Sequence, residues 1–469
     1  MTAPSVLASY RLVRVPRLVF ALALGALACN ALIGADDPVL DPIGPPPPEE
    51  AGASPEASTL PDCGTPPPPD DGPIHVLANG GADDATCGSH GSPCATIGFA
   101  LAQARRASKT IVRVGPGTYR ETITLVAGIT VEGGYFVEKS GDGYTWMPNC
   151  LPKPAPSDDV HIAPDVTMPV VATDLGGTAR LSALTVHQST KAAPGESVYG
   201  IFATGGTTHI ELVDVVIAPA NAGDGPAGAP GTFGTAFDGG CPIGDAANAT
   251  VPGQAGQGAP AGTVDKTGYH PAAGGNGSSG QSGANGTAGQ AGACLMCSKC
   301  NDHCDMGSKQ CGDAGSPGCG GGGGGGGAGG GGGGSSIALF AWGASVTATG
   351  GSIHSGAGGA GGAGGSGGAG SPGAMGPSGP SAPPCGIACT LLLGCSASNY
   401  QAASGGAGSR GGNGAAGGPG GGGAGGWSFA IVSGSDASVT IPDDVLDHSN
   451  YGAGGAQGGA PGRSGKRYP

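Results

Sequence analysis

From residue 73 onward, short apolar runs alternate with polar positions in a pattern that predicts β-strands. The first expected strands cover residues 74–77, 110–114, 123–125 and 129–131. Residues 95–107 differ, because apolar side chains recur there at the three- and four-residue spacing of a helix. The helix is expected to bury one face, made of Ile97, Ala100, Leu101 and Ala104. The regular region is therefore predicted to begin as a set of short strands with one helix.

A repeat with two apolar strand positions seven residues apart occurs four times farther along the chain. Its pairs are Ala179 with Val186, Ile210 with Ile217, Val346 with Ile353, and Val439 with Leu446. Another apolar position precedes each pair, at Val170 or Val171, Ile201, Leu339 and Ile431. One such repeat cannot bury its apolar side alone, whereas stacked repeats can. We therefore expect Ile210, Val346 and Val439 to be neighbours in one core. The hairpin signals of a β-sandwich are largely missing.

Two runs near the start of this region resemble a known family. They are CGSHGSPCATIGFALAQA, which begins at Cys87, and IVRVGPGTYRETITLVAGITVEGGY, which begins at Ile111. Both are similar to the N-terminal part of right-handed parallel β-helix proteins of the pectate-lyase-like superfamily, and especially to a domain recurrent in exported bacterial lipoproteins. The resemblance covers residues 74–150 well and the remainder only by pattern. It implies an all-β fold, a right-handed parallel β-helix, with helix 95–107 as the N-terminal cap. The superfamily includes lyases, hydrolases and non-enzymatic surface proteins, so the resemblance implies no single activity.

Composition divides the chain into regions. Glycine (103 residues) and proline (41) exceed a quarter of the 469 residues, and most glycines fall in two blocks that interrupt the repeats. The expected regions are a signal peptide (1–28), a lipid anchor with a Pro-rich linker (29–72), the N-terminal part of the β-helix (73–220), a Gly/Cys-rich insertion (221–334), a β-helix turn (335–355), a Gly-rich insertion (356–426), a last turn (427–450) and a C-terminal tail (451–469).

The N-terminus has the features of an export signal. Arg11, Arg14 and Arg17 precede an apolar run, residues 18–27, that is too short to span a membrane. The run ends at Ala28-Cys29, which resembles a bacterial lipobox, so we expect Cys29 to be lipidated and the protein to be anchored at the outer membrane or cell surface. An ordinary signal peptide is the alternative. The proline runs that follow favour an extended spacer.

The glycine blocks leave after Ile217 and after Ile353, so both are expected to extend from the same side of the stacked repeats. Glycine recurs at every third residue from 358 to 379, but proline is too sparse for a collagen triple helix. Two interpretations remain. A flexible or partly ordered loop is favoured, because glycine loses the most conformational entropy on ordering. The alternative is a bundle of extended threefold helices packed along their glycine faces.

The chain has 15 cysteines, and removing Cys29 for lipid leaves an even number in an exported protein. Disulfides are the expected use. The candidates are Cys63, Cys87, Cys94, Cys150, Cys241, Cys294, Cys297, Cys300, Cys304, Cys311, Cys319, Cys385, Cys389 and Cys395. If every thiol is oxidised and the four N-terminal cysteines pair among themselves, seven remain in the first glycine block and three in the second, so at least one disulfide should join the blocks. The spacing from Cys294 to Cys304 also matches a ferredoxin motif or a zinc site with His303, but the compartment favours disulfides.

Catalytic chemistry has weak candidates. The repeats offer Asp174, Arg180, Glu211, Asp214, Asp443 and Asp444 to a polysaccharide lyase or hydrolase, and His187, His354 and His448 to a metal ladder. No paired carboxylates recur at equivalent corners, so we assign no catalytic residue, no metal and no cofactor. The net charge of −14 argues against a nucleic-acid partner. The sequons at Asn248, Asn276 and Asn285 carry no weight in a bacterial protein.

Two classes of function therefore compete. We expect a non-enzymatic surface lipoprotein that displays disulfide-tied glycine-rich loops for adhesion or envelope structure. Its partners would be the membrane, through the N-terminal lipid, and cell-surface glycans or envelope proteins. The alternative is a carbohydrate-active lyase or glycoside hydrolase.

Overall fold

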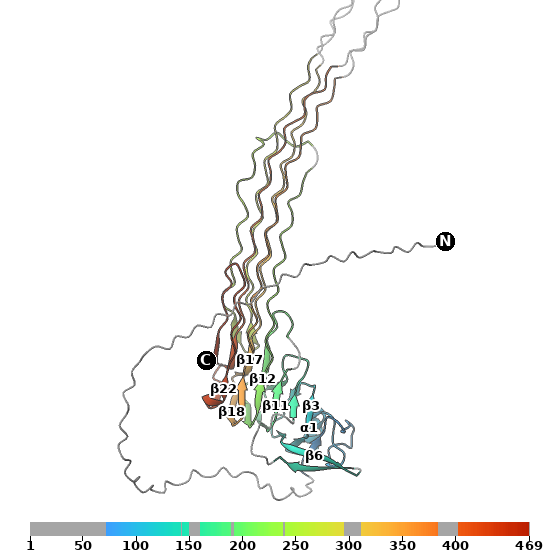
Figure 1. Ribbon diagram of the computed structural model, residues 1–469, viewed down its shortest axis with the longest axis vertical. Coiled ribbons are helices and arrows are strands. Elements are labelled where there is room, and N and C mark those ends of the chain that lie inside the picture. Colours follow the sequence, from blue (N-terminus) through green and yellow to red (C-terminus); the bar gives the residue numbers. More distant parts are fainter. Residues whose placement is uncertain are drawn as a thin grey trace, which may run out of the picture. The chain divides into compact units, whose positions relative to one another are not determined.

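The computed structural model describes residues 72–141, 143–149, 160–188, 192–237, 240–294, 311–382 and 402–468, all in the compact unit Leu60–Pro469. Regular structure in these residues is mostly β-strand, arranged in three parallel sheets and two antiparallel hairpins (Figure 1). The expectation of an all-β fold with parallel strands is confirmed. Cys29, Cys63 and Cys150 lie outside the described residues.

Each sheet collects strands from the whole length of the chain. The first sheet has the order β1 (Ile74–Val76), β2 (Ile111–Val114), β5 (Thr130–Glu132), β10 (Gly177–Ser182), β13 (Thr208–Val213), β18 (Ser345–Thr349) and β21 (Ser438–Thr440). The second has β3 (Gly117–Tyr119), β8 (Val160–Ile162), β11 (Thr185–His187), β14 (Val216–Ala218), β19 (Ser352–His354) and β22 (Leu446–Asp447). The third has β4 (Ile123–Thr124), β9 (Val170–Thr173), β12 (Val198–Thr204), β17 (Ser336–Trp342), β20 (Ser428–Gly434) and β23 (Ser464–Tyr468).

The chain visits the three sheets in a constant order. From β8 onward it enters the second sheet, then the third, then the first, and repeats this order up to β23. The hairpin β15 (Thr263–Asp265) with β16 (Gly268–His270) lies within the first glycine-rich insertion. The hairpin β6 (Tyr135–Ser140) with β7 (Gly143–Pro148) precedes β8. Each round therefore adds one strand to every sheet.

The apolar positions of the sequence repeat stack in register. In the first sheet, Ile210 pairs with Ala179 and with Val346, and Val346 pairs with Val439. The second sheet aligns Val186, Ile217, Ile353 and Leu446. The third aligns Val170, Ile201, Leu339 and Ile431. Nearly all of these side chains are buried in one core, with Val439 packed at its margin. The predicted stacking is confirmed.

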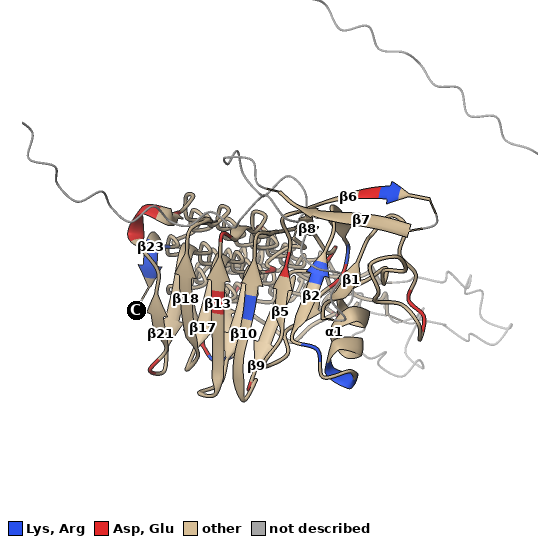
Figure 2. Ribbon diagram, turned by 90° about the horizontal axis from the view of Figure 1, so that it is seen from below, with Lys and Arg blue, Asp and Glu red and all other residues tan. Residues whose placement is uncertain are grey.

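The helix α1 (Ile97–Arg106) forms where the sequence predicts it. Thr96 caps its N-terminus through a hydrogen bond that its hydroxyl accepts from the Phe99 N–H, as its position before the apolar run favours. The four predicted face residues are buried. The helix contacts β1, β2 and β4, the earliest strands of the first and third sheets, and covers that end of the core (Figure 2).

The structure adds elements that the sequence analysis does not predict and corrects one of its regions. Residues 117–119 form β3, in which Thr118 and Tyr119 pair with β8. After β5 the chain forms the β6–β7 hairpin. Residues 451–469, expected as a tail, include β23, which pairs with β20 along its length. These partners are distant in sequence, so local pattern did not indicate them.

Candidate functional site: the glycine-rich bundle

Both glycine-rich insertions join the second sheet to the third. The insertion 221–334 follows β14 and precedes β17, and the insertion 356–426 follows β19 and precedes β20. Because β14 pairs with β19 and β17 pairs with β20, the insertions leave and return at equivalent corners. The prediction that both extend from one side is confirmed (Figure 1).

The described parts of the insertions form an ordered bundle of six extended segments, 222–237, 244–260, 273–292, 312–334, 357–380 and 403–426. Backbone hydrogen bonds between neighbouring segments recur at every third residue. For example, the N–H groups of Gly411, Gly414 and Gly417 donate to carbonyls of segment 357–380 at 3.0, 2.9 and 2.8 Å. A three-residue period is that of an extended, polyproline-II-like helix. The expectation of flexible loops is therefore wrong for these residues, and the threefold bundle is correct.

Segment 403–426 lies inside the bundle and shows why glycine is required. Gly418 donates to Ser278 of segment 273–292 and accepts a bond from Gly327 of segment 312–334, both at 2.9 Å. A Cβ at Gly417 would overlap the carbonyl oxygen of Gly325. Segments can approach this closely only because neither has a side chain at the contact. The backbone bonds made possible by this approach offset the ordering entropy.

In segment 403–426, glycine is replaced by larger residues at positions that no longer face residues 451–462. Residues 451–462 lie against only the base of this segment, where Gly422 and Gly425 donate to the carbonyls of Gln457 and Ala460. A Cβ at either glycine would overlap the backbone of this neighbour. Farther along the same three-residue series, residues 413, 416 and 419 are Asn, Ala and Pro. Larger residues therefore occur where the neighbour ends.

Asparagine side chains satisfy backbone N–H groups at the margins of the bundle. Asn276 and Asn285 accept hydrogen bonds from Gly329 at 2.9 Å and Gly320 at 3.0 Å through their Oδ1 atoms. Asn248 accepts from the N–H of residue 413 at 2.7 Å. These are the sequon residues to which the sequence analysis gave no weight. Asn276 and Asn285 are separated by a multiple of three within segment 273–292, and this spacing was the available signal.

Two disulfides fix the first insertion. Cys241–Cys319 ties the crossing between segments 222–237 and 244–260 to segment 312–334. Cys294–Cys311 joins the ends of segments 273–292 and 312–334. Because Cys294 is oxidised, it is not a ligand of the ferredoxin-like or zinc site considered from sequence. The bundle cysteines beyond these two pairs, and His303, lie outside the described residues: Cys297, Cys300, Cys304, Cys385, Cys389 and Cys395.

The two insertions meet at the far end of the bundle. Gly292 donates to the Gly312 carbonyl at 2.9 Å, and Gly312 lies against the backbone of Pro380 and Ala403. The described residues that flank the ranges 295–310 and 383–401 therefore lie at this end of the bundle.

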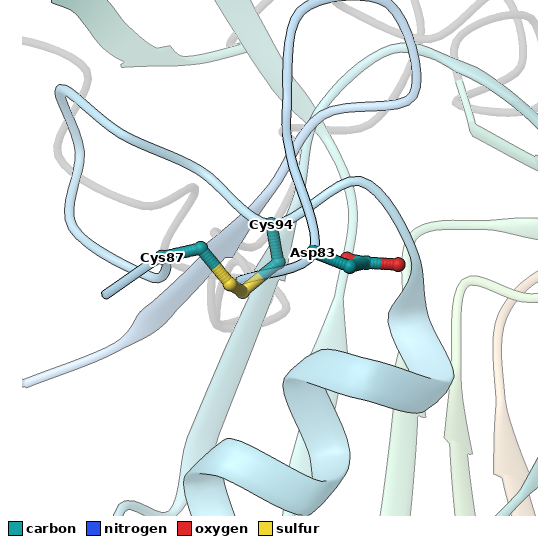
Figure 3. Close-up of side chains that lie close together, drawn as sticks. All are labelled: Asp83, Cys87 and Cys94. Carbon is teal, nitrogen blue, oxygen red and sulfur yellow. A yellow bond between two sulfur atoms is a disulfide. The ribbon is translucent and has the colours of Figure 1, made fainter. Parts of the chain in front are cut away.

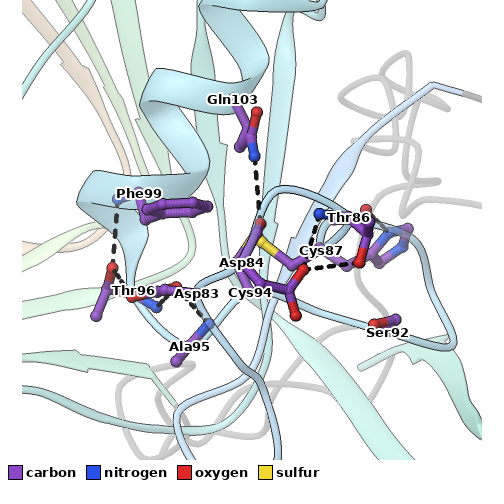
Figure 4. The surroundings of a disulfide bond; sticks show 12 residues. Asp83, Asp84, Thr86, Cys87, Ser92, Cys94, Ala95, Thr96, Phe99 and Gln103 are labelled. Carbon is purple, nitrogen blue, oxygen red and sulfur yellow. Dashed lines mark hydrogen bonds between the residues drawn. A yellow bond between two sulfur atoms is a disulfide. The ribbon is translucent and has the colours of Figure 1, made fainter.

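Asp83, Cys87 and Cys94 are close enough together to suggest a metal site, but each has a structural role (Figure 3). The cysteines form a disulfide. Asp83 Oδ1 accepts hydrogen bonds from the N–H groups of Ala95 at 2.8 Å and Thr96 at 3.0 Å, next to the start of α1 (Figure 4). The prediction that Cys87 and Cys94 are disulfide-bonded is confirmed, and the group closes the loop before the helix.

The carboxylates considered for catalysis are dispersed among turns and edges. Asp174 and Asp214 occupy left-handed turn positions, with φ of 45° and 53°. Arg180 and Glu211 are register partners in the first sheet. No ion pair between them occurs in the described structure, whose ion pairs lie elsewhere. Asp443 binds Arg467 of β23 at 3.0 Å, next to Asp444 in a short 3-10 helix.

The three histidines do not form a metal ladder. His187 stacks edge-on with His161, their ring centroids 5.3 Å apart, and its pKa is lowered by burial and by His161. Its register partner in the next strand is Ala218, which separates it from His354. His354 instead pairs with Asp447. His448 Nδ1 lies 3.0 Å from the carbonyl oxygen of Ser449.

Comparison with protein-family models, with curated proteins and with solved structures finds no match to this chain. Among helices of the described residues, none is long and apolar enough to cross a membrane.

Proposed function

We propose that the protein is an exported, lipid-anchored display protein that presents the far end of the glycine-rich bundle to partners at the outer membrane or cell surface. Cys29 is the proposed lipidation site, and the Pro-rich linker is the proposed spacer. The partners are cell-surface glycans or envelope proteins, in adhesion or envelope structure.

The strand-rich part is proposed to be a right-handed parallel β-helix of the pectate-lyase-like type. Three parallel sheets visited in constant order, with apolar side chains aligned in register, support this assignment. In a β-helix the backbone groups of each round form hydrogen bonds with the rounds before and after it. The bundle would therefore extend from a rigid domain. An experimental structure with left-handed connections between β10, β11 and β12 would contradict it.

The observation that carries the display function is the length and order of the bundle. Segment 403–426 extends about 70 Å at the 3.1 Å rise per residue of its helix type. The glycine contacts and backbone hydrogen bonds of the bundle, together with the two disulfides of the first insertion, support a rigid extension rather than a flexible loop. The described residues that flank the ranges 295–310 and 383–401 lie at the far end of the bundle. In the described residues, the alternative of a polysaccharide lyase or glycoside hydrolase has no comparable supporting observation.

Two experiments test the proposal. In the first, the full chain is screened against glycans and envelope proteins, with a variant in which short Gly-Ser turns replace residues 295–310 and 383–401. The control replaces only Lys266 and Thr267, at the exposed turn of the β15–β16 hairpin. We expect the control to bind and the shortened variant to lose binding. Equal binding by both, or no binding by the unmodified chain, would contradict the display function.

The second experiment replaces Cys29 with serine. Because a lipidated cysteine is the proposed anchor, Cys29→Ser should move the protein from the membrane to soluble fractions. Unchanged membrane partitioning would show that Cys29 is not the anchor.

A further inference from the structure

A histidine, an aspartate and a serine lie close together at the end of the second sheet. β19 ends at His354 and β22 ends at Asp447, and the two residues are register partners. Asp447 Oδ2 lies 3.3 Å from His354 Nδ1. Ser449 follows two residues later, and its Oγ lies 3.5 Å from His354 Nε2. A carboxylate and a hydroxyl therefore face opposite nitrogens of one imidazole.

This order of carboxylate, imidazole and hydroxyl is the arrangement that activates a serine as a nucleophile. A carboxylate at Nδ1 favours the tautomer with its proton on Nδ1, which leaves the Nε2 lone pair toward the hydroxyl. Asp447 remains ionised at neutral pH, because the His448 N–H bonded to it at 2.8 Å lowers its pKa, as does His354. Both heavy-atom distances are long for hydrogen bonds, and catalytic pairs shorten when substrate binds.

The backbone beside the serine supplies donors. In the described structure, the N–H groups of Ser449, Asn450 and Tyr451 donate to no protein acceptor. The N–H of the nucleophile and that of the next residue are common oxyanion donors in acyl transfer. His354 is 44% exposed and Asp447 74%, so the site is open to a substrate carried on a larger molecule.

We propose that Ser449, His354 and Asp447 form a hydrolytic site for accessible carboxylic esters. Ser449 Oγ attacks the ester carbonyl carbon while its proton passes to His354 Nε2. The C–O bond to the alcohol breaks, the alcohol leaves with that proton, and Ser449 is acylated. Water then attacks the acyl carbon, His354 takes its proton and returns it to Ser449, and the carboxylic acid leaves. Asp447 acts as a positioning residue.

A covalent probe tests the site in the full chain. We expect a fluorophosphonate to label Ser449, identified by peptide mass spectrometry, and p-nitrophenyl acetate to be hydrolysed. Ser449→Ala should abolish both the label and the activity, and His354→Gln should slow labelling about 10²-fold. Asp447→Asn should slow labelling, and Asp447→Glu should restore part of the rate. Partial rescue by glutamate at position 447, but not by asparagine, would not follow from a purely structural role.

Ser352→Ala is the matched control, because Ser352 is an exposed serine at the start of the same strand as His354. This variant should keep the label and the activity. Absence of label on Ser449 in the folded protein, or equal hydrolysis by Ser449→Ala, would overturn the proposal. Binding by the bundle is measured separately, so the display function and the esterase site can fail independently.

Discussion

Replacing Gly417 with alanine tests whether close backbone approach determines the bundle. Gly417 belongs to segment 403–426 and has neighbours on several sides. An alanine Cβ there would overlap the carbonyl oxygen and carbon of Gly325, which are backbone atoms with no rotamer to change. Segments 403–426 and 312–334 must therefore move apart.

The cost follows from the bonds at this contact. Separation weakens the bonds that cross this contact, which Gly324 donates to Ala415, Gly327 donates to Gly418 and Gly330 donates to Gly421. Two or three backbone bonds, each worth about 0.5–1.5 kcal/mol net, give a loss of about 1–4.5 kcal/mol. A cost of about 1–3 kcal/mol for overpacking has the same origin and should not be added in full.

Hydrogen exchange read by mass spectrometry measures this loss locally. Amides of segment 312–334 should exchange about 5- to 2 × 10³-fold faster in Gly417→Ala, since about 1.4 kcal/mol corresponds to tenfold. Amides of β12 and β13 should keep their protection. Gly406→Ala is the control in the same segment, because its Cβ would meet Gln290 at an ordinary 3.7 Å. Equal exchange in the two variants would refute close approach as the reason for glycine.

Three further predictions concern the ends and margins of the protein. Burial lowers the pKa of His75 to about 4, so the unfolded chain binds a proton there at higher pH than the folded protein. This contribution is complete above about pH 6.5 and decreases by about 2–3 kcal/mol as the pH falls to 4. His75→Gln should therefore reduce the loss of thermal stability between pH 7 and 4. Asn276→Ala should speed exchange of the Gly329 amide, at a cost of about 0.5–1 kcal/mol, and leave distant amides unchanged. Non-reducing peptide mapping should find at least one disulfide between the two insertions if Cys63 pairs with Cys150. Disulfides confined to single insertions would contradict this prediction. The cysteines concerned are Cys297, Cys300, Cys304, Cys385, Cys389 and Cys395.

Sequence alone determined the features that depend on local spacing. The helix is predicted by the separation of its apolar residues, and the stacked core by pairs such as Ile210 with Ile217 and Val346 with Ile353. These predictions held because the periodicity of a helix or strand fixes which side chains share a face. The corner from which the insertions leave followed from the same repeat.

The tertiary structure decided whether the glycine blocks are ordered. Glycine every third residue is compatible with a flexible loop, and entropy favours that loop for an isolated segment. Order depends on neighbours that supply acceptors for each backbone N–H, and these neighbours come from both insertions and from residues 451–462. No local window contains that information.

The structure also decided which polar residues lie together. His354 and Asp447 are far apart in sequence but become neighbours because β19 and β22 are consecutive strands of one sheet. His187 and His354 fit the same sequence pattern, yet Ala218 separates them. Sequence spacing therefore determined the faces of the strands, and strand register determined which side chains meet, because each partner in a parallel sheet is a full round of the chain away.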